Sequence, residues 1–258
     1  MLVAAAWALG LVGKAWGDAP AWAAILLLIW PYTGVAAFNA QFTFLPLAAL
    51  GIGYWLYTRE YDVAAGLIMV FATIKPELAA VPLIAISIIA LHNKRWRFLG
   101  ALAAGGLVLF AVSMLMAGFW VVEWLQSLQR YSQYAQVVWV PGFTWSISPL
   151  LTAALGMIVL ACILWMRDSS PAWFTMSIPL GLLVLPQTIF WGLSMILLVC
   201  MLVWTKRTWW MPMLVWGIGW PLFVLLSSDF WRWQSTLVSL SGVILVAVAS
   251  HFIDNGLD

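Results

Sequence analysis

The sequence predicts an all-α protein, a polytopic bundle of transmembrane helices with about 10–11 hydrophobic segments, two of them short. The 258 residues are 65% hydrophobic and 8% charged, with a mean hydropathy of +1.03, whereas a soluble domain carries about 25% charged residues. Apolar runs bounded by charges recur from end to end and leave no room for a soluble domain. The runs lack the alternation of β-barrel strands, so we expect helices to satisfy the backbone in lipid. Residues 1–258 therefore form a single integral membrane domain.

The stretch from 59 to 97 departs most from an ordinary membrane span. Two apolar arms, residues 63–74 and 78–91, flank Lys75, Pro76 and Glu77. Arms of about 12 to 14 residues reach about 18 to 21 Å, and a bilayer core needs about 20 helical residues. We expect a helical hairpin with Lys75 at its tip, where an ionisable side chain is costly and therefore indicates function. The alternative is that Lys75 marks a loop and Pro76 begins the next helix.

The remaining hydrophobic segments alternate with short polar interruptions. The one long polar interval, residues 118–148, carries Trp120, Trp124, Leu128 and Tyr131 at helical spacing. It predicts an outer loop with an amphipathic helix on the membrane surface. The other expected segments are residues 21–38 (interrupted by Pro31), 42–57, 98–117, 149–167, 173–185, a run ending at 206–207, 208–226 and, after an outer loop at 227–234, residues 235–252.

The distribution of lysine and arginine predicts the orientation of the chain. Basic residues collect in cytoplasmic loops of membrane proteins. The assignment that follows this rule places eight basic residues inside, namely Lys14, Arg59, Lys94, Arg95, Arg97, Arg167, Lys206 and Arg207, and three outside, namely Lys75, Arg130 and Arg232. The N-terminus is then outside and the C-terminus inside. The polar interruptions at Asn39 and Gln41, at Lys75 and Glu77, at Gln187 and at Asp229 all come to the outer face.

The outer face offers three carboxylates as candidate general bases: Glu77, Glu123 and Asp229. Glu77 follows Lys75 by two residues and begins a helix, where the helix dipole stabilises an anion, so it is the candidate catalytic base. Glu123 fits a solvated helix face. Asp229 and Arg232 fit a surface ion pair.

Lys75 suits a phosphate group because its ammonium is a point charge. The sequence contains no Walker loop, no cluster of metal ligands and no trustworthy Ser/His/Asp order, so we expect no cofactor and no metal. Cys162 and Cys200 lie in apolar runs and are expected to be buried. The residues alone predict an outer-face site for an anionic amphiphile. Its candidate substrate-binding residues are Lys75, Gln41, Asn39, Gln187, Asp229 and Arg232.

Several short motifs, in order, resemble the bacterial family 87 glycosyltransferases of the GT-C class, formerly a domain of unknown function. They are Asn39-Ala-Gln41-Phe-Thr before a span, Ala65-Gly66-Leu67, Ile74-Lys75-Pro76-Glu77 and the cluster Lys94-Arg95-Trp96-Arg97. The resemblance covers roughly residues 20 to 205 and includes the stretch from Pro179 through Pro186-Gln187 to Trp191.

The resemblance implies a transferase of the bacterial inner (cytoplasmic) membrane that passes several times through the bilayer. Such enzymes transfer mannose or a related sugar from a polyprenyl-phosphate donor to a lipid or glycan acceptor at the outer face, without nucleic acid as a partner. The implied role of Lys75 is contact with the lipid phosphate, and that of Gln41 is contact with the sugar.

The chain departs from the family pattern in two places. Asn-Ala-Gln stands where a Gly-Gln-x-Asn-like patch is usual, and the acidic first outer loop of GT-C enzymes has no counterpart. We therefore expect a separate N-terminal half or a larger membrane complex to complete the enzyme, and little transferase activity from this chain alone. Two alternatives stay open: a non-catalytic membrane subunit that retains the fold, and a transporter of a lipid-linked substrate, although no internal repeat is visible.

Overall fold

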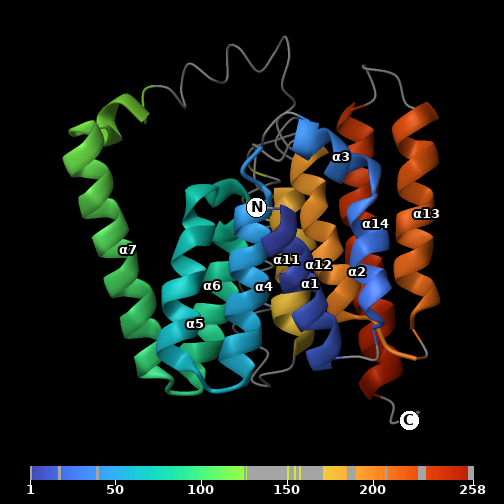
Figure 1. Ribbon diagram of the computed structural model, residues 1–258, viewed down its shortest axis with the longest axis horizontal. Helices are drawn as coiled ribbons and strands as arrows, with labels where there is room; N and C mark the ends of the chain where they lie inside the picture. The colour runs from blue at the N-terminus through green and yellow to red at the C-terminus, as the bar shows by residue number, and fades with distance from the viewer. Residues whose placement is uncertain are drawn as a thin grey trace.

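All secondary structure in the described part of the chain is helical, which confirms the predicted all-α class. The computed structural model describes residues 2–16, 19–38, 41–124, 126, 150, 154, 157, 171–184, 190–206, 208–225 and 231–254. Most helices run side by side, up and down along one direction (Figure 1). In chain order they are α1 (Leu2–Trp16), α2 (Ala21–Leu28), α3 (Pro31–Phe38), α4 (Phe44–Thr58), α5 (Asp62–Met69), the 3₁₀ helix η1 (Val70–Ile74), α6 (Pro76–His92), α7 (Trp96–Ala117), α11 (Pro171–Val184), the 3₁₀ helix η2 (Phe190–Met195), α12 (Ile196–Leu202), α13 (Trp210–Leu225) and α14 (Trp231–Asp254).

Helix α4 forms the centre of the N-terminal half. It packs against α1 on one side and α5 on the other, and residues on all of its faces are buried. Small residues make this possible, since a Cβ atom at Gly51 would already touch Ala8 of α1 and Leu198 of α12 at 3.4 Å. A helix that is apolar all round belongs inside a bundle.

Helix α12 is the corresponding centre of the C-terminal half. All of its residues, Ile196–Leu202, are buried, and among them is Cys200. Helices α1, α11 and α14 surround it. The burial of Cys200 agrees with its expected role as a small apolar residue, while Cys162 lies outside the described residues.

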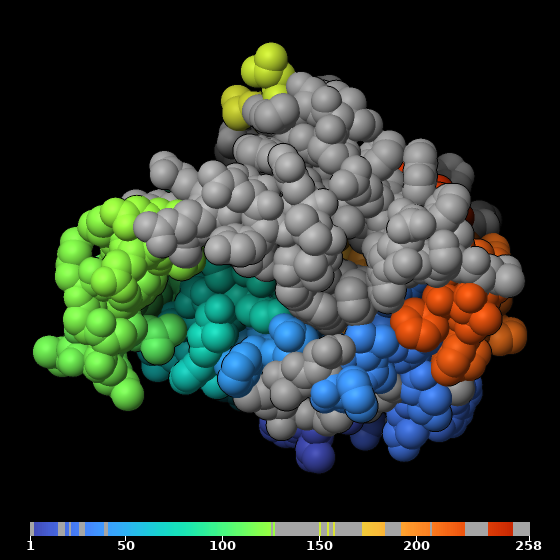
Figure 2. Space-filling view, turned by 90° about the horizontal axis from the view of Figure 1, so that it is seen from above, coloured from blue at the N-terminus to red at the C-terminus, as the bar shows by residue number. Residues whose placement is uncertain are grey.

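Helix α7 stands at the edge of the molecule, as Figures 1 and 2 show. Its only buried residue is Phe98. Near Phe98, at the N-terminal end of α7, the helix lies close to α5 because Gly66 of α5 has no side chain. A Cβ atom on Gly66 would lie 2.7 Å from the carbonyl oxygen of Phe98. Within the described residues, α7 is also the one helix long and apolar enough to cross a membrane by itself.

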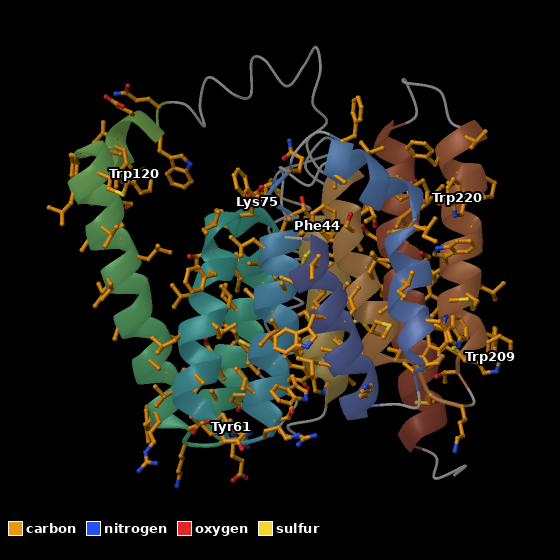
Figure 3. All side chains as sticks on the ribbon, viewed as in Figure 1. Phe44, Tyr61, Lys75, Trp120, Trp209 and Trp220 are labelled. Carbon is orange, nitrogen blue, oxygen red and sulfur yellow. The ribbon has the colours of Figure 1, made fainter. Side chains whose placement is uncertain are left out.

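The alternation of the helices places the charged turns at two opposite ends of the bundle (Figures 1 and 3). Tyr61 lies at one end, close to the starts of α5 and α7, and Lys75 lies at the other. The end with Tyr61 receives Lys14 at the last turn of α1, Arg59 after α4, Lys94, Arg95 and Arg97 around the α6–α7 turn, and Lys206 after α12. The start of α14, which carries Arg232, lies at the same end as Lys75.

The helix boundaries differ from the predicted segments in a few places. The predicted interruption at Pro31 is real: α2 ends at Leu28 and α3 begins at Pro31, because proline has no N–H for the preceding turn. The predicted outer loop at 227–234 is too long, since α14 already begins at Trp231. Residues 231–234 contain neither glycine nor proline, so nothing local stops the helix. Of the segment predicted at 149–167, the structure describes residues 150, 154 and 157.

Candidate functional site

Lys75 lies between η1 and α6, at the tip of the predicted hairpin. Its backbone is extended, with φ −125° and ψ 79°, as expected for a residue that precedes a proline. Pro76 occupies the first helical position of α6, where its missing N–H costs nothing. Lys75 therefore follows the end of η1, and Pro76 begins α6. The hairpin has Lys75 at its tip, and Lys75 is also the short connection between the two helices.

The Lys75 ammonium contacts two oxygen atoms from the segment before α4. Its Nζ donates to Gln41 Oε1 at 3.0 Å and to Thr43 Oγ1 at 3.5 Å. Thr43 is fully buried and Gln41 is half-buried. Gln41 is held in turn by its own N–H, which donates to the Ala36 carbonyl at 2.9 Å. Lys75 and Gln41, both predicted from the sequence, thus meet at one end of the bundle (Figure 3).

Thr43 is the member of this cluster that the sequence analysis missed. It directly precedes α4 and makes no capping hydrogen bond to that helix. A threonine two residues after a polar patch is a weak local signal, because Ser and Thr are common before helices for capping alone. Only the return of the chain at Lys75 gives this hydroxyl group its partner.

Burial weakens the charged state of the lysine. The pKa of Lys75 lies below its ordinary value because burial disfavours the ammonium, and the negative charge of Glu77 partly offsets this effect. Oxygens from Gln41 and Thr43, both neutral side chains, fix the position of the ammonium at this end of the bundle.

Glu77 lies in the first turn of α6 and is half-buried. A carboxylate in this position is stabilised by the N-terminal end of the helix dipole. Its side chain and the Lys75 ammonium belong to the same end of the same helix, so a ligand held by one is within reach of the other's field. The arrangement combines a cation with a candidate proton acceptor.

The other predicted site residues are not placed by the structure. Asn39, Gln187 and Asp229 lie outside the described residues, and so does the side chain of Arg232, although its backbone is part of α14. Of the predicted amphipathic loop, the structure describes residues 118–124 and 126. There Trp120 and Trp124 form an edge-to-face pair with ring centroids 6.2 Å apart, and Glu123 is exposed as expected.

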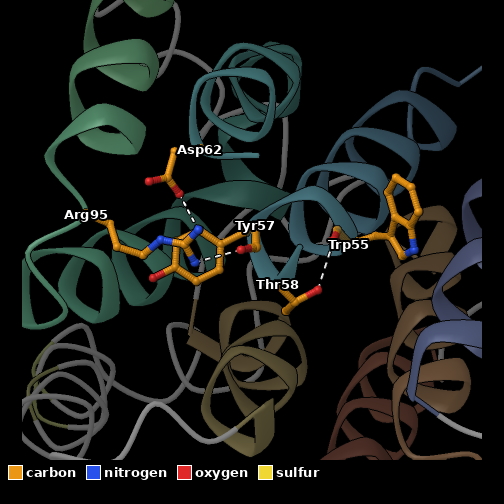
Figure 4. A network of polar contacts seen from close by, with 5 residues as sticks. All are labelled: Trp55, Tyr57, Thr58, Asp62 and Arg95. Carbon is orange, nitrogen blue, oxygen red and sulfur yellow. Dashed lines mark hydrogen bonds and ion pairs between the residues drawn. The ribbon is translucent and has the colours of Figure 1, made fainter. Parts of the chain in front are cut away.

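A second polar cluster, at the opposite end of the bundle, was not predicted from the sequence (Figure 4). The Arg95 guanidinium forms an ion pair with Asp62, and Nη1 donates to the Tyr57 carbonyl at 2.6 Å. The guanidinium carbon also lies 3.9 Å from the centroid of the Tyr57 ring, a cation–π distance. Tyr57 in turn packs edge-to-face on Phe98, with centroids 5.0 Å apart.

This Arg95 clasp joins three elements at one point. Tyr57 comes from the end of α4, Asp62 from the first turn of α5 and Arg95 from the residue before α7. From the sequence, Arg95 was predicted only to be one of the basic residues on the cytoplasmic side. The structure shows that it is 17% exposed, with Asp62 at 18%, so Arg95 contributes to packing as well as to the charge of this end.

Among the described residues, no group of three or more His, Cys, Asp or Glu side chains could hold a metal ion. Comparison with protein-family models, with curated proteins and with solved structures finds no match for this chain. The resemblance to family 87 therefore stays a prediction. The Lys75 site is the part of the structure that bears on the function it implies.

The Arg95 clasp predicts a stability difference between two neighbouring arginines. Arg95→Ala should lower the free energy of unfolding by about 2 to 3 kcal/mol, somewhat less than breaking a fully buried pair, because it leaves Asp62 partly buried without its cation. Arg97→Ala is the matched control, since Arg97 is exposed, and should change stability by less than about 0.5 kcal/mol. Denaturant or thermal unfolding in one detergent would measure both. Equal losses for the two variants would contradict the clasp.

Proposed function

We propose that this chain is a multi-pass membrane protein of the GT-C type. It transfers a sugar, of the mannose kind, from a polyprenyl-phosphate donor to a lipid or glycan acceptor at the outer face of the bacterial inner membrane. The observation that supports this proposal best is the Lys75 ammonium, held on Gln41 and Thr43 at the end of the bundle away from most of the described basic residues. A cation at that end of an apolar bundle suits the phosphate of a lipid.

The proposed chemistry is a direct displacement. The acceptor hydroxyl oxygen forms a bond to the anomeric carbon, and the bond from that carbon to the phosphate oxygen breaks. The electron pair leaves with the phosphate, whose growing charge the Lys75 ammonium stabilises. The acceptor proton passes to the Glu77 carboxylate, the candidate base on the first turn of α6.

One observation favours the transporter alternative. At the break between α2 and α3, the indole N–H of Trp30, the hydroxyl of Tyr32 and the hydroxyl of Thr33 are buried without a hydrogen-bond partner. Broken helices with polar groups are typical of transporter binding sites. Movement of an intact lipid-linked sugar across vesicles, without sugar transfer, would favour this alternative over the transferase. The third possibility, a non-catalytic subunit of a larger complex, would show neither activity.

The proposed orientation predicts which turns can be labelled from each side of the membrane. A cysteine placed at exposed Lys94 should react with an impermeant maleimide only after permeabilisation, because this turn belongs to the end with the larger number of basic residues. A cysteine placed at exposed Glu123 should react in intact cells. The buried Cys200 should stay unlabelled in both states. Labelling of residue 94 from outside would overturn the orientation and the outer-face site with it.

The Lys75 contact predicts a loss of affinity for lipid phosphate. Lys75→Met removes the charge and keeps most of the apolar bulk, so it should weaken polyprenyl-phosphate binding by about ten- to a hundred-fold. Lys75→Arg keeps the charge and is the matched control. Equilibrium binding in nanodiscs would measure both. An unchanged affinity in Lys75→Met would mean that the lysine only extends to the lipid headgroup region and does not bind the polyprenyl phosphate.

The same contact predicts a pH dependence. Binding needs the ammonium, so it is complete well below the pKa of Lys75 and is lost as pH rises through that pKa. This loss should begin at a lower pH than for an ordinary lysine, because burial lowers the pKa. Lys75→Arg should bind equally across the range, because arginine keeps its charge.

The role of Glu77 predicts a split between binding and transfer. Glu77→Gln keeps the shape of the side chain and removes the proton acceptor, so sugar transfer should fall by about 10² to 10⁴-fold. Polyprenyl-phosphate affinity should change little. The measurement compares sugar transfer by Glu77→Gln with transfer by the wild-type protein under the same conditions. Transfer at an undiminished rate by Glu77→Gln would assign the base to another residue.

A further inference from the structure

A groove between η1 and α7 offers room for an apolar chain. It has a volume of about 360 Å³ and is open to the surface along one side. Its walls come from α5 and η1 on one side and from α7 on the other. Among the residues that line it are Leu67, Val70, Phe71, Gly105, Val108 and Val112.

The groove exists because α7 touches the bundle at small residues and then runs on as an exposed helix. Gly105 lies against η1, and a Cβ atom there would be 2.8 Å from Val70 Cγ2. Beyond Gly105, towards the end of α7, Val108 and Val112 line the groove and remain exposed. A space bordered in this way by exposed valine, leucine and phenylalanine side chains favours an apolar occupant.

An apolar path leads from this groove to Lys75. In a 3₁₀ helix the residues i and i+3 lie on one face, so Ile74 continues the face on which Phe71 lines the groove. Leu67, Phe71 and Ile74 are all exposed. At a rise of about 2.0 Å per residue, Phe71 lies roughly 8 Å from Lys75 along the axis. The ammonium turns to the α4 side of η1, towards Gln41 and Thr43, so a bound lipid crosses the end of η1 over Ile74.

The described part of the chain has a second apolar groove. It lies between α6 and α7, has the same volume of about 360 Å³ and is lined by residues that include Leu83, Leu91 and Leu99. Leu91 and Leu99 flank the α6–α7 turn, at the end of the bundle opposite Lys75. That turn carries Lys94, Arg95 and Arg97, whereas the groove beside η1 leads to Lys75, at the end of the bundle proposed to face the outer side of the membrane.

We infer that the groove between η1 and α7 binds the isoprenoid chain of a lipid phosphate whose phosphate group pairs with Lys75. The inference rests on the proposed phosphate contact and adds the place where the chain lies. A single groove accepts one chain, which suits a polyprenyl phosphate better than a lipid with two acyl chains. The cation at one end and the apolar groove along the adjacent helix match the two parts of such a ligand.

Two pairs of variants test the groove. Gly105→Leu fills it, and Gly106→Leu is its control because a Cβ atom at Gly106 would meet nothing within 4 Å. Val108→Phe also fills the groove without adding an atom at the crowded Gly105 position, and Leu107→Phe is its control. Val108 and Leu107 are similarly exposed, at 63% and 69%, but only Val108 lines the groove. The second pair keeps the test valid if Gly105→Leu does not fold.

The probes are undecaprenyl phosphate and isopentenyl phosphate, which share the phosphate and differ in chain length. Gly105→Leu and Val108→Phe should weaken binding of undecaprenyl phosphate by about tenfold or more, the equivalent of about 1.4 kcal/mol. They should leave isopentenyl phosphate binding unchanged. Gly106→Leu and Leu107→Phe should leave both probes unchanged.

Two outcomes would overturn the inference. The first is an equal effect of Val108→Phe and Leu107→Phe on undecaprenyl phosphate. The second is displacement of undecaprenyl phosphate by phosphatidic acid at equal affinity, which would make the groove a site for acyl lipids in general. Lys75→Met separates the two proposals: if it weakens both probes while Val108→Phe weakens neither, the groove is wrong and the phosphate contact stands. If Lys75→Met leaves isopentenyl phosphate binding unchanged, the phosphate contact itself is wrong.

Discussion

Gly66 lies so close to α7 that a Cβ atom on it would be 2.7 Å from the Phe98 carbonyl oxygen and 2.8 Å from the Leu102 nitrogen. Any other residue would therefore push α7 away from α5. On the next face of α5, Met69 fills the space that a side chain at Gly53 of α4 would need. Small residues at a helix–helix contact let the two backbones approach this closely. These contacts set α4, α5 and α7 side by side, and η1, Lys75 and the groove take their positions from that arrangement.

The features that the sequence predicts well are those with a local physical cause. Pro31 and Pro76 mark helix boundaries because they lack an N–H donor, and both boundaries are where they were expected. The short arm ends before Lys75 because the residue before a proline avoids the α conformation. Gln41 and Lys75 are polar interruptions between apolar segments, and the alternation of the helices predicts that both lie at the same end of the bundle. Their hydrogen bond follows from that topology.

The features that the sequence could not predict depend on contacts between distant segments. Tyr57, Asp62 and Arg95 carry no shared pattern, and Arg95 follows Asp62 by 33 residues, so only the packed hairpin brings them together. The burial of each helix could not be predicted either, because the helices are uniformly apolar. The sequences of α12, which is wholly buried, and of α7, which has one buried residue, are similarly apolar, and a helix that is apolar all round has no face that marks the core. Which helix lies inside is decided by small residues such as Gly51 and Gly66.

Helix α7 is attached at one end and extends beyond its attachment at the other. The Arg95 clasp and Gly66 hold its first turns, Gly105 lies against Val70 of η1, and about 18 Å of helix follow from Gly105 to Ala117. A bend of roughly 10° at Gly105 would move the far end by about 3 Å and leave the Arg95 clasp in place. A spanning helix that is longer than the local hydrocarbon thickness accommodates the mismatch by tilting or kinking. In the proposed membrane location, the width of the groove beside η1 would be coupled to the thickness of the surrounding lipid, so the membrane itself would become a determinant of which chains the protein can hold.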